Sequence, residues 1–86
     1  MPLNHVFVEV GRDISDRAEI DRGTFRRLVM EFVGRAYPRA EVIVVFNDLL
    51  PTGRIDLGVR GDTQHERIVR HLMDRASERS RRRARS

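Results

Sequence analysis

Three segments of the chain have residue patterns typical of β-strands. Residues 5–10 alternate between valines and other side chains, as in a strand that buries one face. Residues 42–46 are an unbroken β-branched and aromatic run, which predicts a central strand that is either buried on both faces or covered at its neighbours. Turn-forming residues 47–53 lead to apolar residues at 55, 57 and 59, so the third strand is expected to return antiparallel as a hairpin with the second.

A longer segment between the first two strands has apolar residues at helical spacing. It predicts an amphipathic helix over about residues 17–37. Asp16, with Glu19 three residues later, is one possible cap for its start, and Asp21 is the other. The helix is expected to end at Tyr37-Pro38, because proline disfavours helical backbone in the residue before it.

A second helix is predicted from residue 63 to about residue 77 or slightly beyond. Thr63 and Glu66 have the spacing of a capping box. The apolar stripe of this helix comprises Ile68, Val69, Leu72, Met73 and Ala76. Residues 79–86 are rich in arginine and contain no large apolar side chain, so we expect a disordered tail after a single domain of residues 1–78.

The predicted order of elements is β-α-β-β-α. A right-handed crossover makes the first two strands parallel, and both helices can then cover the same face of the sheet. The sequence therefore predicts an α+β fold, a two-layer sandwich of a three-stranded mixed sheet with two helices on one face. The expected core comprises Val6, Val8, Phe25, Leu28, Phe32, Val44, Leu57, Leu72 and Met73.

Length and composition narrow the classes of function. A chain of 86 residues has room for one hydrophobic core. The absence of cysteine excludes disulfides, thiolate zinc sites and cysteine nucleophiles. The longest apolar run, residues 42–46, is too short to cross a bilayer, and the first residues do not have the pattern of a secretory signal, so a cytoplasmic location is expected.

Charge is distributed unevenly along the chain. Residues 1–78 carry 12 arginines against 13 carboxylates, whereas residues 79–86 carry five arginines, so the net charge of +4 arises in the tail. Arginines in a flexible tail are suited to salt-sensitive, nonspecific contact with the phosphates of DNA or RNA, although a solubilising role explains them equally well. The candidate nucleic-acid residues are Arg79, Arg81, Arg82, Arg83 and Arg85.

Residues with catalytic or metal-binding chemistry are few. His5, His65 and His71 lie on separate predicted elements without the spacing of metal ligands, and no glycine-rich phosphate loop is present, so neither a metal nor a cofactor is expected. One enzymatic alternative remains open. Pro2 before the first strand and Gly11-Arg12 after it resemble the start of tautomerase superfamily proteins, and this resemblance implies Pro2 as general base and Arg12 as the binding residue for a substrate carboxylate.

Most of the chain, residues 6–76, resembles the DinI-like family of small bacterial proteins, named for a DNA-damage-inducible modulator of the recombinase RecA. The resemblance lies in the order and spacing of Phe7-Val8-Glu9-Val10, Tyr37-Pro38, Ala40-Glu41-Val42-Ile43-Val44, Leu50-Pro51, Gly61-Asp62-Thr63, Glu66, Ile68 and Leu72. It implies a non-enzymatic regulatory protein of the SOS DNA-damage response that binds a RecA-type filament through an acidic last helix.

The last helix of this chain departs from that family pattern, because arginines alternate with its carboxylates and the C-terminal residues are basic. The residues that the resemblance places at a partner surface are Asp62, Glu66, Arg70, Asp74 and Glu78. Expected partners are therefore a RecA-type filament and, through the tail, DNA or RNA. The chain itself is expected to be a monomer or a weak homodimer.

Overall fold

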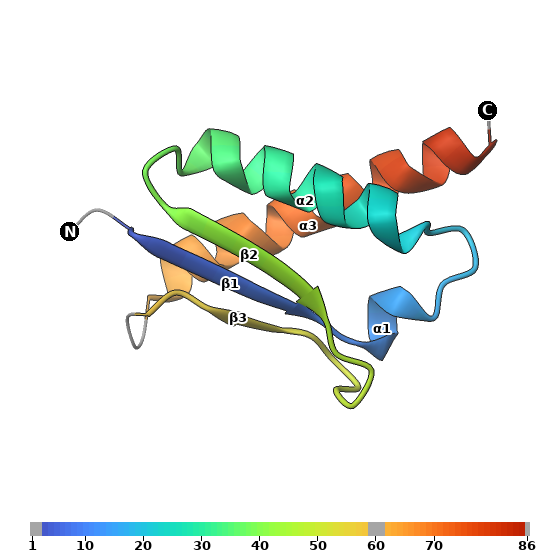
Figure 1. Cartoon of the computed structure of the whole chain (residues 1–86), viewed down its shortest axis with the longest axis horizontal. Coiled ribbons are helices and arrows are strands. Elements are labelled where there is room, and N and C mark those ends of the chain that lie inside the picture. The colour runs from blue at the N-terminus through green and yellow to red at the C-terminus, as the bar shows by residue number, and fades with distance from the viewer. Residues whose placement is uncertain (1–2, 59–61, 86) are drawn as a thin grey trace.

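The structure is a computed structural model that describes residues 3–58 and 62–85, the side chains of residues 83–85 excepted. Its elements are β1 (His5–Val10), α1 (Arg12–Ser15), α2 (Arg22–Ala36), β2 (Glu41–Phe46), β3 (Arg54–Asp56) and α3 (Thr63–Arg85), as Figure 1 shows. The fold is α+β with one small mixed sheet, as the sequence predicts.

The order of strands in the sheet is β2-β1-β3. β1 pairs in parallel with β2, as predicted, over six consecutive residue pairs. The predicted hairpin is wrong, because β3 pairs antiparallel with β1 and not with β2. The prediction of a central second strand is wrong for the same reason: β2 lies at an edge, and Val45 is 37% exposed.

The crossing of the chain past the end of β1 explains this strand order. The N–H groups of Arg12 and Asp13 donate to the carbonyls of Leu50 (2.9 Å) and Pro51 (3.1 Å), so the segment after β2 is held against the start of α1. Gly11 and Gly53 meet at this crossing. The segment that reads as a hairpin turn therefore carries the chain to the other side of β1.

The helical segment after β1 is divided in two. α1 is a single turn, and α2 begins only at Arg22, where the side chain of Asp21 accepts a hydrogen bond from the N–H of Gly23 at 3.0 Å. Of the two possible caps, Asp21 is confirmed and Asp16 is wrong, because α1 ends at the residue before Asp16. α2 ends at Ala36, before Tyr37-Pro38, as predicted.

α3 is longer than the sequence predicts. It continues without a break through the segment expected to be a disordered tail and ends at Arg85 (Figure 1). The described burial gives a reason, because Ala76, Ser77 and Ser80 are all buried and extend the packed face of the helix toward its C-terminus. Ile68, predicted to lie in the apolar stripe, is instead 39% exposed.

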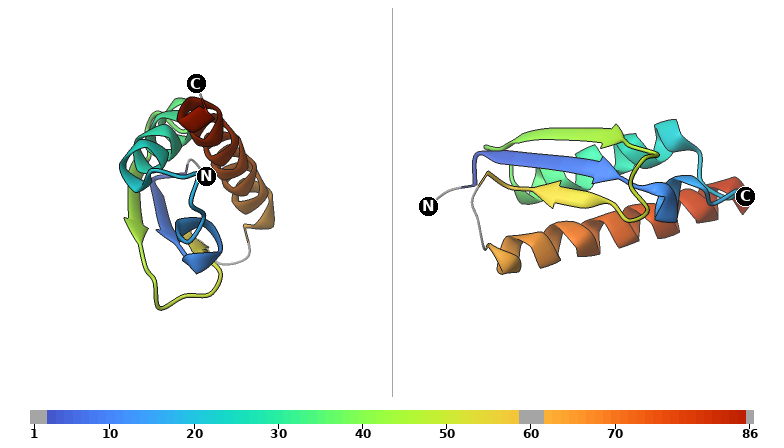
Figure 2. Two further views of the ribbon diagram at one scale, coloured as in Figure 1. Left: turned by 90° about the vertical axis from the view of Figure 1, so that its right-hand side faces the viewer. Right: turned by 90° about the horizontal axis from the view of Figure 1, so that it is seen from below.

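The alternating valines of β1 pack the sheet against both long helices. Val6, Val8 and Val10 are fully buried, whereas the residues between them are half-buried. The three valines belong to one buried cluster with residues of α2 and α3, among them Phe25, Leu28, Val29, Val33, Val69, Met73 and Ala76. The predicted core is confirmed, with Phe32 and Leu72 at its border. α2 and α3 lie next to each other in both views of Figure 2.

Gly53→Ala tests the crossing at the end of β1, and Gly34→Ala is its control. A Cβ at Gly53 would lie 2.5 Å from the backbone oxygen of Glu9, so Gly53→Ala is expected to lower the free energy of unfolding by about 1–3 kcal/mol or more. A Cβ at Gly34 in α2 would meet nothing within 4 Å, so Gly34→Ala should raise the free energy of unfolding by about 0.5–1 kcal/mol. Urea denaturation measures both values, and a Gly53→Ala variant as stable as the wild type would contradict the crossing.

Candidate functional site

The start of α3 is held by a polar cluster that joins it to the end of α2. The side chain of Asp62 accepts a hydrogen bond from the N–H of His65 at 3.1 Å, so Asp62 caps the helix in place of the predicted Thr63–Glu66 box. The hydroxyl of Tyr37 lies 2.8 Å from Nδ1 of His65. Burial, together with the nearby charge of Asp62, raises the pKa of Tyr37. These contacts fix where α3 begins.

α3 packs on α2, and the C-terminal half of α3 buries small side chains. Ala76, Ser77 and Ser80 are buried, and among the described residues the hydroxyls of Ser77 and Ser80 have no hydrogen-bond partner. Small residues at these positions allow two helices to lie close together. Because this face is buried, the opposite face of α3 points to solvent and its charges are available for contact.

Three arginines form a continuous line on the solvent face of α3. Arg75, Arg79 and Arg82 are exposed and occupy positions i, i+4 and i+7, which lie on one side of a helix. We call them the arginine stripe. At a rise of about 1.5 Å per residue the stripe is about 10 Å long. Among the described residues, only Arg82 of the three has an ion pair, with Glu78 at 2.9 Å, and its side chain is still 78% exposed.

The other predicted nucleic-acid residues do not join the described stripe. Arg81 is half-buried on a different side of the helix. The side chains of Arg83 and Arg85 lie outside the described part of the structure, although the backbone is helical at both positions. The structure thus brings together Arg79 and Arg82 of the predicted set and adds Arg75, which sequence analysis assigned to the domain. The helical spacing of Arg75, Arg79 and Arg82 was a usable signal, but the expected end near residue 77 obscured it.

The predicted partner surface on the same helix is partly neutralised by its own arginines. Glu66 pairs with Arg70 at 3.1 Å, and Glu78 pairs with Arg82. Asp62 is used as the cap, and Asp74 borders a shallow cavity of about 210 Å³ between α1 and α3. These carboxylates therefore do not form an uninterrupted acidic surface of the kind that the resemblance implies.

The open face of the sheet carries a polar cluster that sequence analysis missed. The carboxylate of Glu9 accepts hydrogen bonds from Nδ2 of Asn47 at 3.0 Å and from Arg54 at 3.3 Å. The hydrogen bond from Asn47, with help from Arg54, holds the pKa of Glu9 below its usual value of about 4.5 despite partial burial. Phe7, Glu9 and Arg54 line a shallow concavity of about 340 Å³. These residues are far apart in the sequence, so only the strand register reveals the cluster.

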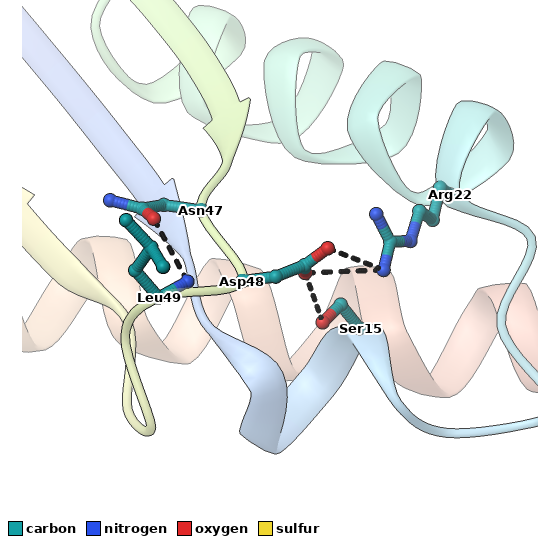
Figure 3. A network of polar contacts seen from close by, with 5 residues as sticks. All are labelled: Ser15, Arg22, Asn47, Asp48 and Leu49. Atoms are coloured by element: carbon teal, nitrogen blue, oxygen red, sulfur yellow. Dashed lines mark hydrogen bonds and ion pairs between the residues drawn. The ribbon is translucent and has the colours of Figure 1, made fainter.

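A second polar network joins α1, α2 and the segment after β2 (Figure 3). The carboxylate of Asp48 accepts hydrogen bonds from the hydroxyl of Ser15 at 3.1 Å and from Arg22 at 3.2 Å. The side chain of Asn47 accepts one from the N–H of Leu49 at 3.0 Å. Ser15 donates to a carboxylate and, among the described residues, has no histidine partner that could activate it as a nucleophile. This network therefore has a structural role: it holds three segments of the chain together.

Of the two residues of the enzymatic alternative, only Arg12 lies within the described chain. Arg12 is exposed at the start of α1, beyond the carboxyl end of β1, whereas Pro2 lies outside the described residues. Among the described residues, no group of three or more histidine and carboxylate side chains is placed to hold a metal ion.

The helices over residues 3–58 and 62–85 include none with the length and apolar content of a membrane span. Comparisons with protein-family models, with curated proteins and with solved structures find no match to this chain.

The lowered pKa of Glu9 predicts a pH-dependent contribution to stability. Because the folded state favours the ionised carboxylate, this stabilisation is present above about pH 4.5 and is lost as the pH falls through the lowered folded-state pKa. Glu9→Gln is therefore expected to melt below the wild type at neutral pH and to approach it as the pH falls below about 4.5. Thermal melting from neutral to acidic pH measures the difference, with the exposed Glu41→Gln as control. A difference that does not change with pH would contradict the assigned role of Glu9.

Proposed function

We propose that this chain is a small non-enzymatic regulatory or interaction protein that contacts the phosphate backbone of nucleic acid through the arginine stripe. The observation that carries the proposal is the exposure of Arg75, Arg79 and Arg82 along one side of a helix. A helix fixes the backbone positions of the three arginines along one line, so less backbone entropy is lost on binding than with a flexible tail. Arginine also binds phosphate through two parallel hydrogen bonds. A cytoplasmic location is part of this proposal.

The charge distribution along the chain supports this surface over others. Residues 1–74 carry 11 arginines against 12 carboxylates, and several of these arginines are engaged, such as Arg22 with Asp48 and Arg54 with Glu9. Binding of a RecA-type filament by an acidic helix has less support, because Glu66 and Glu78 are paired with arginines of the same helix. Phosphate contact needs only the groups that α3 exposes.

The proposal predicts a salt-dependent affinity for nucleic acid that depends on the stripe. Three phosphate contacts give a slope of about −2.7 in log K against log salt on duplex DNA. Arg75→Ala/Arg79→Ala/Arg82→Ala should remove most of this slope and weaken binding at low salt by at least about tenfold. Fluorescence anisotropy with a labelled duplex measures both quantities. Alanine is a strong helix former, so α3 should persist in the variant, and circular dichroism checks this.

A matched variant separates the stripe from charge in general. Arg17, Arg27 and Arg39 are also exposed, lie away from α3 in the sequence and make no ion pair among the described residues. Replacing these three by alanine removes the same charge. The slope of log K against log salt is expected to stay within about 0.9 of the wild-type slope, which is the contribution of one phosphate contact. An equal loss of affinity and slope in both triple variants would show that the arginine stripe is not the binding site. No binding by the wild type at low salt would refute the proposal itself.

Glu78 offers a test in the opposite direction. It pairs with Arg82 and adds a negative charge beside the stripe. Glu78→Gln should release Arg82 and remove repulsion from phosphate, so we expect affinity to rise by about two- to tenfold at low salt. The same titration measures this gain. Unchanged or weaker binding by Glu78→Gln would argue against a phosphate contact by Arg82.

A further inference from the structure

The outer edge of β2 exposes alternate backbone groups. The N–H groups of Glu41 and Asn47 donate to carbonyls at either end of β1, on Asn4 (3.0 Å) and Val10 (2.9 Å). In a parallel pair, successive residues direct their backbone groups to opposite sides of the strand. The groups of residues 41, 43, 45 and 47 therefore face β1, and those of 42, 44 and 46 face outward. In the described part of the chain no strand pairs with this outer side.

Two arginines from α2 cover this edge. Nε of Arg26 donates a hydrogen bond of 2.9 Å to the outward carbonyl of Val44. The guanidinium of Arg22, one helical turn earlier, lies 5.2 Å from the ring centre of Phe46 and pairs with Asp48 (Figure 3). The middle of the edge and its carboxyl end are thus each capped by a charged side chain.

The same edge would otherwise fit a second copy of the chain. An antiparallel pairing about a two-fold axis at Val44 sets Val42 opposite Phe46 and Ile43 opposite Val45, so apolar residues meet apolar residues. β2 contains neither proline nor lysine, and it pairs with β1 without a β-bulge. These are features by which edge strands usually prevent pairing with another chain, so β2 itself has few of them. At this axis, however, Arg26 would meet Arg26 of the second copy.

We propose that Arg22 and Arg26 guard the β2 edge against pairing with a second copy of this chain. Arg26 occupies the acceptor that a second strand needs, and like charges repel across the two-fold axis. Arg22 covers the carboxyl end of the strand at Phe46 and is held there by Asp48. This protection of the β2 edge is independent of the arginine stripe, because Arg22 and Arg26 lie on α2 and their role needs no nucleic acid.

The test compares the oligomeric state of variants by sedimentation velocity across the micromolar to millimolar range. Wild type should remain monomeric. Arg26→Ala should lower the dimer dissociation constant by at least about tenfold, and Arg22→Ala/Arg26→Ala should lower it further. The control is Arg27→Ala, an exposed position on the same helix, which should behave as wild type. Circular dichroism melting establishes that each variant is folded, and Arg26→Gln replaces any variant that does not melt cooperatively.

A second substitution shows whether any association uses the edge. Val45 is an exposed residue of β2, and a lysine there provides a new charge on the strand at little cost to the core. Arg26→Ala/Val45→Lys should therefore return to the monomer. The proposal is overturned if Arg22→Ala/Arg26→Ala stays monomeric at millimolar concentration. It is also overturned if the association of Arg26→Ala persists unchanged in Arg26→Ala/Val45→Lys, because the contact would then lie elsewhere.

Discussion

The central position of β1 is the constraint on which the rest of the structure depends. It pairs with both other strands, and its three alternating valines are completely buried against residues of α2 and α3. To place β3 on the far side of β1, the chain must pass the end of β1, and the contact between Gly11 and Gly53 allows this passage. The same arrangement leaves β2 at an edge and leaves one face of β1 only half-buried.

Arginine has two separate roles in this molecule. Some arginines hold elements together: Arg22 joins α2 to Asp48, Arg26 caps β2, and Arg54 joins β3 to Glu9. The stripe on α3 has few such contacts within the described chain and faces solvent. The overall charge of +4 therefore understates how strongly one surface is cationic. This division is the physical basis for proposing ligand binding by α3 and edge protection by α2.

Local pattern predicted the elements of this fold well and their arrangement less well. The valine alternation of β1 and the end of α2 at Tyr37-Pro38 depend on neighbouring residues, so the sequence alone identified them. Strand order depends on which strand the segment after β2 meets, and a run such as residues 42–46 suits a central or an edge position. The Glu9 cluster and the Arg26 cap join residues distant in the sequence, and no local pattern records such pairs.

The extension of α3 was missed because arginine-rich composition favoured disorder. The signal that could have found it is the spacing of small residues, since Ala76, Ser77 and Ser80 continue the buried line of Val69 and Met73. Helical backbone over residues 79–82 is the premise of the arginine stripe. Backbone ¹³Cα chemical shifts of the wild-type protein in solution test it most directly. Shifts typical of helix through Arg82, with slowed amide exchange at Ser80, are the predicted result, whereas random-coil shifts from Arg79 onward would contradict it.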